Sequence, residues 1–171
     1  MAFDASRLRH GEVVAGVSAV VMLALMLLTP WYGLSGAAAR AAASVGLSNV
    51  TVDGFNGLTT LRWLILLTIL SALGLTWLQA TRRAPALPVS FSVIVTVLGL
   101  LTTLALIYRV LINVPGPDSL IDSRFGAYLG LVAAASLTYG AFRSLREEGV
   151  PDGLEAAIPT VSVSRSGSGP G

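Results

Sequence analysis

Four long runs without a charged residue constrain this chain more than any other feature of its sequence. The runs cover residues 13–30, 63–80, 89–108 and 125–142, and each contains 18 to 20 residues. At about 1.5 Å per residue, a helix of that length spans roughly 27–30 Å, close to the hydrocarbon thickness of a bilayer. The four runs therefore predict four transmembrane helices.

The composition of the chain favours lipid as its surroundings. Only 12% of the residues are charged and 54% are hydrophobic, whereas soluble domains carry about 25% charged residues. A buried helix of a soluble core is the alternative for one such run, but four of them would leave almost no amphipathic helix to cover the core. We expect an all-α fold, a four-helix transmembrane bundle with up-down-up-down topology.

The flanking residues divide the chain into three parts. We expect a cytoplasmic segment over residues 1–12, a membrane domain over 13–146 and a cytoplasmic tail over 147–171. The tail is rich in Pro, Gly and Ser, which predicts disorder. Including flanking residues, many of them aromatic, the spans are predicted at about 13–32, 61–80, 89–110 and 124–143.

The arginines predict the orientation of the chain. Arg82 and Arg83 lie in the short connection between the second and third runs, beside no acidic residue. Positive charges next to a span resist translocation, so this connection and both termini are predicted to be cytoplasmic. With that topology, the inner segments contain seven arginines and the outer segments four.

The first run has a second interpretation, as a cleaved signal peptide. Arg7 and Arg9 precede the run, and residues 37–39 follow it with an A-x-A pattern. The run is long for a signal peptide, and many residues separate it from the pattern. We prefer a retained first span, and cleavage stays open.

Short elements are expected in the two outer connections. The alanine-rich residues 36–46 predict a short helix, and residues 49–57 predict a strand followed by a turn. In the second connection, residues 115–117 turn the chain, and Asp118 or Asp122 is placed to cap the fourth helix.

Residue types that carry catalysis are scarce. Cysteine is absent, His10 is the single histidine, and no protease, hydrolase or phosphate-loop motif occurs. No acidic residue lies within the four runs, which argues against a pump or a proton-coupled transporter. A net charge of +2 with scattered arginines gives no stripe for nucleic acid. We therefore expect no enzyme, no cofactor, no metal site and no nucleic-acid partner.

Charged residues at the outer ends of the spans form the candidate binding site. Guanidinium groups bind phosphate and carboxylate well, so this outer arginine rim is a candidate site for an anionic lipid or solute. The alternative is structural, because arginine near a helix end also extends to the interface or pairs with a nearby acid. The residues of the outer arginine rim are Arg62, Arg109, Arg124 and Asp122.

Small residues at every fourth position mark one face of the last span. Gly126, Gly130 and Ala134 follow this spacing. Small residues let helices approach closely in lipid, so we expect this face to pack against another helix.

Four stretches together resemble a known group of proteins. They are TPWYGLSG at 29–36, DGF at 53–55, RRAPALPV at 82–89 and GAYLGLVAAA at 126–135. Across residues 7–146 the chain resembles uncharacterised four-span membrane proteins of GC-rich actinobacteria. The resemblance implies a multi-pass protein of a bacterial plasma membrane, with no activity to carry over.

Two functional classes follow from the sequence. We expect a structural or accessory membrane protein that packs against another membrane subunit or against itself. The alternative is a small membrane protein that binds an anionic lipid or solute at the outer arginine rim.

Overall fold

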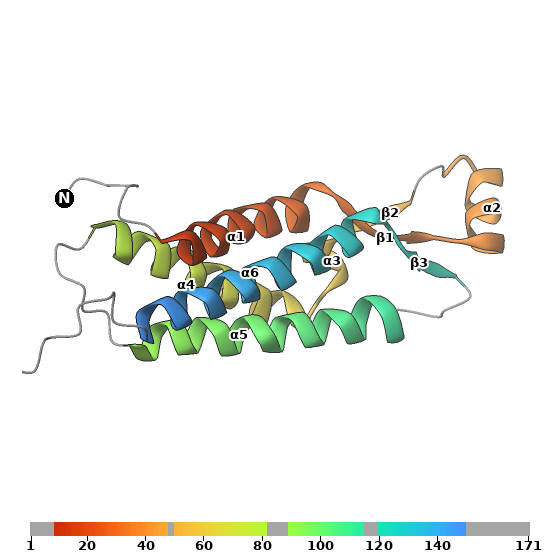
Figure 1. Cartoon of the computed structure of the whole chain (residues 1–171). Coiled ribbons are helices and arrows are strands. Elements are labelled where there is room, and N and C mark those ends of the chain that lie inside the picture. The colour runs from red at the N-terminus through yellow and green to blue at the C-terminus, as the bar shows by residue number, and fades with distance from the viewer. Residues whose placement is uncertain (1–8, 48–49, 82–88, 115–119, 150–171) are drawn as a thin grey trace, which may run out of the picture.

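Four long helices dominate the computed structural model (Figure 1), which describes residues 9–47, 50–81, 89–114 and 120–149. They are α1 (His10–Leu28), α4 (Leu61–Thr81), α5 (Val89–Ile107) and α6 (Phe125–Gly149). Helix α5 continues into a π-helical turn, η2 (Tyr108–Ile112). All four are long and apolar enough to cross a membrane, as in a multi-pass membrane protein.

Each long helix packs against two others. Helix α1 contacts α4 and α6, and α5 contacts α4 and α6, so the four enclose a common core. Successive helices run in opposite directions (Figure 1). We call the end where α1 begins and α6 ends the terminal end, and the opposite end the sheet end.

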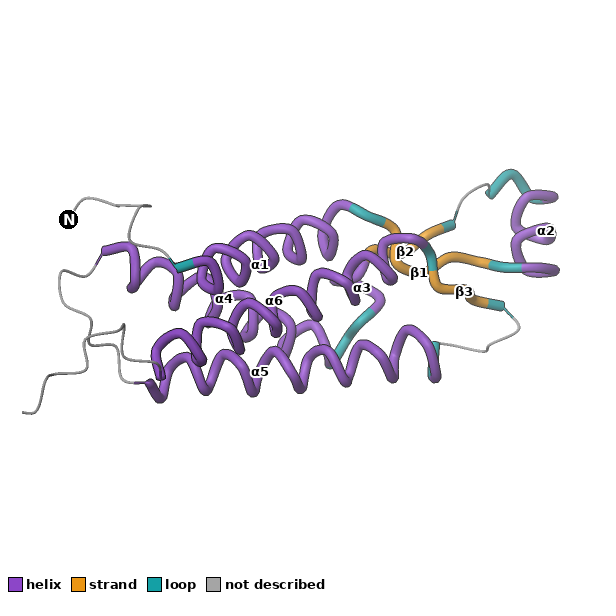
Figure 2. The backbone as a smooth tube through the Cα atoms, in the orientation of Figure 1, coloured by secondary structure: helices purple, strands orange, loops and turns teal. Residues whose placement is uncertain are grey.

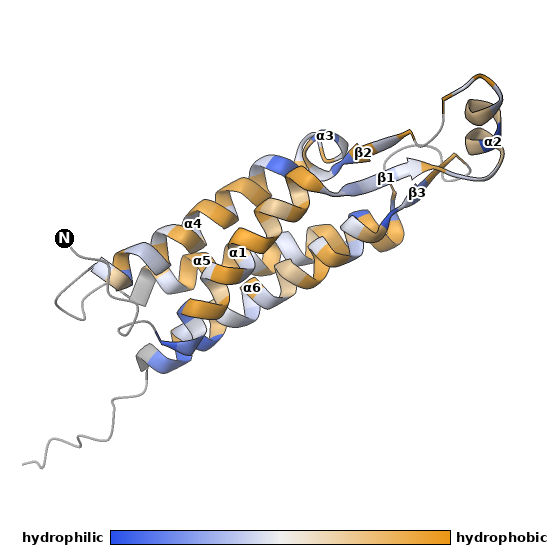
Figure 3. Ribbon diagram, turned by 90° about the horizontal axis from the view of Figure 1, so that it is seen from above, coloured by the Kyte–Doolittle hydropathy of each residue, from blue (hydrophilic) through white to orange (hydrophobic). Residues whose placement is uncertain are grey.

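The outward faces of the helices are apolar as well (Figure 3). Val17, Leu70 and Val132 are 59%, 65% and 61% exposed, although each lies in the middle of its helix. A helix that is hydrophobic all round suits a lipid surrounding rather than water.

Helices α1 and α6 approach closely enough for their backbones to touch at the terminal end. A Cβ atom added to Gly140 would lie 2.5 Å from the backbone nitrogen of Ala15. One added to Gly11 would lie 2.5 Å from the backbone nitrogen of Ser144. Contact of this kind needs small residues on both helices, because larger side chains would hold the backbones apart. Close packing matters here, since apolar side chains gain nothing by leaving lipid.

Threonine pairs join α5 to its neighbours. The hydroxyls of Thr68 and Thr102 lie 2.7 Å apart between α4 and α5, and those of Thr103 and Thr138 lie 2.9 Å apart between α5 and α6. Such hydrogen bonds between membrane helices contribute about 0.6–2 kcal/mol each.

The sheet end carries a small antiparallel sheet (Figure 2). Its strands are β1 (Pro30–Leu34), β2 (Thr51–Asp53) and β3 (Ile121–Ser123), in the order β2-β1-β3. Tyr32 pairs with Val52 on one side and Ser123 on the other. Two short helices, α2 (Gly36–Ser44) and α3 (Gly54–Gly57), complete this cap.

Strand β1 was not predicted, because residues 30–32 were included in the first span. Helix α1 ends at Leu28, and Thr29 is extended, with φ −112° and ψ 147°. A residue before proline is pushed out of the helical region by the proline ring, so Pro30 ends the helix. Strand β3 was also missed, whereas the helix expected within 36–46 and the strand within 49–57 are present.

Trp31 anchors the cap to the bundle. Its side chain is fully buried, and Cβ atoms added to Gly54 and Gly130 would lie 2.6 Å and 2.4 Å from its ring. The indole Nε1 donates to the carbonyl of Leu25 at 2.8 Å. Residue 31 therefore ties α1, α3 and α6 together and does not face the headgroup layer.

The helix limits differ from the predicted spans at the terminal end. Helix α1 begins at His10, which brings Glu12 into its first turn, where it is 2% exposed. The Glu12 carboxylate accepts from the backbone nitrogen of Arg9 at 3.1 Å. Helix α6 continues to Gly149, past residue 143, the predicted end of the fourth span, and past residue 146, the predicted end of the membrane domain. Residues 82–83, residue 118 and the predicted disordered tail from residue 150 on lie outside the described residues.

Candidate functional site

The predicted rim residues all lie at the sheet end. Arg62 is in the first turn of α4, Arg109 is in η2, Asp122 is in β3, and Arg124 follows β3. No ion pair joins Asp122 to an arginine within the residues that the structure describes. The structure therefore gathers these residues at one end of the bundle, and among the described residues it shows no pair of Asp122 with an arginine of the kind that the structural alternative predicts.

Each of the three rim arginines contacts its own surroundings. The guanidinium of Arg62 lies 5.0 Å from the ring centroid of Phe55, which is a cation–π contact. Its Nε is buried and has no acceptor among the described residues. Arg124 donates through Nη2 to the carbonyl of Leu34 at 2.9 Å, so it ties the start of α6 to β1.

Arg109 lies beside a buried phenol. It donates through Nη1 to the carbonyl of Asn113 at 3.3 Å, across the end of η2. Tyr32 is 3% exposed, and burial raises its pKa to about 12, with the nearby positive charge of Arg109 opposing the rise. The Tyr32 hydroxyl has no hydrogen-bond partner among the described residues.

The packing residues predicted on the fourth span lie on buried positions of α6. A Cβ atom on Gly126 would meet the Oγ1 of Thr29 at 2.4 Å, and Gly130 faces the ring of Trp31. Ala134 is 2% exposed. Gly126 and Gly130 of this regularly spaced set therefore pack against residues 29–31, the segment that joins α1 to β1.

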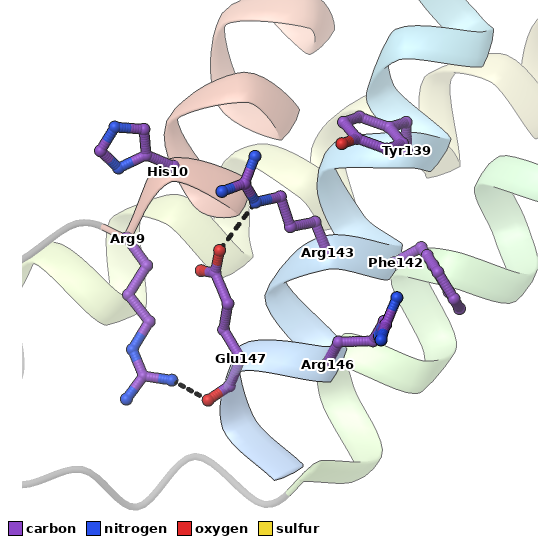
Figure 4. Close-up of a pocket in the computed structure, with 7 residues that line it drawn as sticks. All are labelled: Arg9, His10, Tyr139, Phe142, Arg143, Arg146 and Glu147. Carbon is purple, nitrogen blue, oxygen red and sulfur yellow. Dashed lines mark hydrogen bonds and ion pairs between the residues drawn. The ribbon is translucent and has the colours of Figure 1, made fainter. Parts of the chain in front are cut away.

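A second group of arginines surrounds a recess at the terminal end (Figure 4). The cavity has a volume of about 750 Å³ and lies between the start of α1 and the last turns of α6. We call it the terminal recess. Its lining residues are Arg9, His10, Tyr139, Phe142, Arg143, Arg146 and Glu147.

Helical spacing brings the α6 part of the lining together. The five α6 residues lie at positions 139, 142, 143, 146 and 147. Steps of three or four residues lead from 139 to 142 and 143 and from these to 146 and 147, so the five share one face of the helix. Arg143 Nε donates to Glu147 Oε1 at 2.9 Å, a one-turn ion pair. The guanidinium of Arg146 lies 6.0 Å from the ring centroid of Phe142.

Arg9 closes the terminal recess from the other helix. Its Nη1 donates to the backbone carbonyl of Glu147, as Figure 4 shows. The last carbonyls of a helix carry partial negative charge, which favours a cation at that position. Arg9 thereby fastens the start of α1 to the end of α6.

The lining of the terminal recess is positively charged. Among the described lining residues, three arginines face the carboxylate of Glu147, so these residues carry a net charge of +2 with His10 neutral. Within the described residues, no three His, Cys, Asp or Glu side chains are grouped to hold a metal ion. The arrangement is suited to bind an anion.

The sequence suggested no binding role for Arg9, Arg143 or Arg146: all three counted toward the orientation, and Arg9 also toward the signal-peptide interpretation. The spacing of Tyr139, Arg143 and Arg146 was a readable signal, because it combines aromatic and basic residues on one face at the end of an apolar helix. The contribution of Arg9 had no local signal, since it comes from the opposite end of the sequence.

No protein-family model matches this chain, and neither a curated protein nor a solved structure was found to match it. The resemblance to four-span actinobacterial proteins therefore stays a prediction.

Proposed function

We propose that this chain is a non-catalytic structural or accessory subunit of a bacterial plasma membrane, which docks to another membrane protein through helix α2. The observation that carries the proposal is that no residue of α2 is packed into the protein core. None of its nine residues is buried. It extends away from the bundle, beyond the sheet (Figure 1).

A helix of this length is marginal in water on its own, because isolated helices shorter than about 12–15 residues rarely persist. Contacts from another molecule are the natural source of the missing stabilisation. Six of the nine residues are alanine, which allows a second helix to approach closely. Val45 and Leu47 follow directly, at 71% and 59% exposed, and extend the apolar surface. We therefore infer a helical segment of another membrane protein as the partner.

The predicted orientation gives the side on which docking occurs. If the connection that contains Arg82 and Arg83 is cytoplasmic, the sheet end and α2 face the outside. The partner would then present its helix at or above the outer membrane surface.

Photocrosslinking in the native cells tests the proposal. A photoreactive residue at Ala41, exposed on α2, should give one adduct of defined mass with another membrane protein. The same residue at Thr60, exposed next to α4 on the bundle side of the cap, is the matched control and should give none. An adduct of twice the chain mass would identify a second copy as the partner. Equal adducts at both positions, or none at either, would overturn docking through α2.

The second candidate function is anion binding at the outer arginine rim. It is supported by the Nε of Arg62, which is buried and lacks an acceptor among the described residues. Arg124 and Arg109 already donate to backbone carbonyls, which makes this candidate the weaker one. The double variant Arg109→Gln/Arg124→Gln tests it directly, and unchanged retention of anionic lipid in a folded double variant would overturn it.

A further inference from the structure

We propose that the terminal recess binds the phosphate of an anionic lipid headgroup, with Arg143 and Arg146 as its principal ligands. This inference does not depend on docking through α2, because the two features lie at opposite ends of the bundle (Figure 1).

The charge of the terminal recess calls for an anion. Arg143 uses Nε for its bond to Glu147, which accounts for one of the five donors of its guanidinium group. Arg146 makes no ion pair with the part of the chain that the structure describes. Its guanidinium lies over the Phe142 ring. Figure 4 shows the guanidinium of Arg143 on the side of α1 and that of Arg146 beside Phe142. A phosphate bound by both would draw the two flexible side chains together and accept charge-assisted hydrogen bonds from each.

The position of the terminal recess favours a lipid over a small solute. Tyr139 and Phe142 are 58% and 47% exposed, at the point where the apolar part of α6 gives way to charged residues. Exposed aromatic rings next to arginines are typical of the headgroup level of a membrane. If the terminal end is cytoplasmic, it also faces the leaflet that is rich in anionic lipid.

An apolar groove gives the acyl chains a place to lie. It begins at Val13, one helical turn from His10, and runs along α1 past Val17 and Val20 to the side of α4, with a volume of about 340 Å³. His10, Val13 and Val17 are three and four residues apart, so they share one face of α1. The terminal recess and the groove share no described lining residue. In our proposal the phosphate of the lipid binds in the terminal recess and its hydrocarbon chain follows this face of α1 to the groove, whereas free phosphate would use only the recess.

Lipid retention by the purified full-length chain tests this site. The delipidated protein in a mild detergent is mixed with equal amounts of phosphatidylglycerol and phosphatidylcholine, and bound lipid is counted by native mass spectrometry. We expect a preference for phosphatidylglycerol that falls at least about tenfold in Arg143→Gln/Arg146→Gln. The control Arg40→Gln removes a charge from exposed α2, outside both groups of arginines, and should retain the preference.

Folding of each variant is checked by thermal unfolding, since the loss of Arg143 leaves Glu147 without its ion-pair partner. If the recess double variant does not fold, Arg146→Gln alone replaces it, again with Arg40→Gln as its control. Arg146 has no carboxylate partner among the described residues, so this substitution leaves no acid unpaired there. We expect reduced phosphatidylglycerol binding in Arg146→Gln only.

Competition with inorganic phosphate separates the two sources of the ligand. Retention of phosphatidylglycerol in excess phosphate supports a lipid site that includes the groove. Displacement of the lipid by phosphate would overturn the proposal that the ligand is a lipid, and would indicate a site for free phosphate. Equal loss of lipid in the recess and control variants, loss in the control variant alone, or no loss in either would overturn the terminal recess as the site.

Discussion

The two ends of the bundle use their arginines differently. At the sheet end, Arg124 donates to a backbone carbonyl of β1 and Arg62 lies against an aromatic ring of α3, so both support the folded cap. Arg109 donates to a backbone carbonyl one turn further along, at the end of its own helical segment. At the terminal end, Arg143 and Arg146 line an open cavity with exposed aromatic rings. Arginine at the end of an apolar helix is therefore not by itself a sign of ligand binding.

The difference follows from what surrounds each end. Long connections at the sheet end fold into strands whose carbonyls and rings are available to the guanidinium groups. Among the described residues of the terminal end there is no comparable cap. Arg143 and Arg146 there belong to α6, and Arg9 directly precedes α1. Backbone carbonyls of a folded cap accept the hydrogen bonds of nearby arginines. Arginines at the end of a helix without such a cap keep donors available for lipid headgroups.

The largest expected effect separates the two ends by side of the membrane. Single cysteines replace exposed His10 at the terminal end and exposed Ser44 on α2, in a chain that has no cysteine of its own. Because the arginine distribution predicts a cytoplasmic terminal end, an impermeant thiol reagent should label only position 44 in intact cells. Both positions should react after permeabilisation. Labelling of position 10 alone would reverse the orientation, and labelling of both in intact cells would contradict opposite sides.

Much of the bundle was predictable because its signal is local. An apolar run of about 20 residues fixes a membrane helix wherever its neighbours are, and all four long helices lie where such runs occur. The sheet was not predictable in the same way. Its strands have three to five residues each, and β1 pairs with β3 from a distant part of the chain. Such short strands carry almost no pattern of their own, since pairing decides their structure.

Trp31 and Arg9 illustrate the same limit for single residues. Trp31 lies next to an apolar run and resembles an interfacial aromatic residue, yet glycines from α3 and α6 enclose it. Arg9 lies before α1 and completes a cavity whose other lining residues, apart from His10, come from α6. In both cases the environment of the side chain is set by residues from distant parts of the sequence, so the local sequence does not predict it.

A series of glycine variants compares how tightly α6 is packed at the two ends. Gly140→Leu directs a side chain into the backbone of Ala15, which cannot move aside, so we expect a loss of about 3 kcal/mol or more. Gly130→Leu meets the ring of Trp31, which can shift, and should cost about 1–3 kcal/mol. Gly74→Leu in α4 is the control, because nothing lies within 4 Å of its Cβ position. Thermal unfolding in detergent measures all three. A Gly140 variant as stable as the Gly74 variant would contradict the backbone contact between α1 and α6.

The smallest expected effect concerns the phenol beside Arg109 at the sheet end. The Tyr32 hydroxyl is buried without a partner among the described residues, and burial raises its pKa to about 12. The unfolded chain ionises this phenol near pH 10, and the folded chain holds the proton more tightly. Stability is therefore unaffected by this group below about pH 10 and falls between about pH 10 and 12, by at most about 1.4 kcal/mol per pH unit.

Tyr32→Phe separates the hydroxyl from the ring. It removes a buried polar atom that lacks a partner, so stability at neutral pH should change by less than about 1 kcal/mol or rise. The loss of stability between about pH 10 and 12 should become shallower, because one titrating group is gone. Tyr108→Phe is the matched control, since the Tyr108 hydroxyl is exposed and accepts from Asn113 Nδ2 at 3.2 Å. Chemical unfolding in detergent from pH 8 to 12 measures the three proteins. A clear loss at neutral pH in Tyr32→Phe would mean that the hydroxyl has a partner after all, and then Arg109 at the sheet end would be part of a polar network rather than a cation beside an unpartnered phenol.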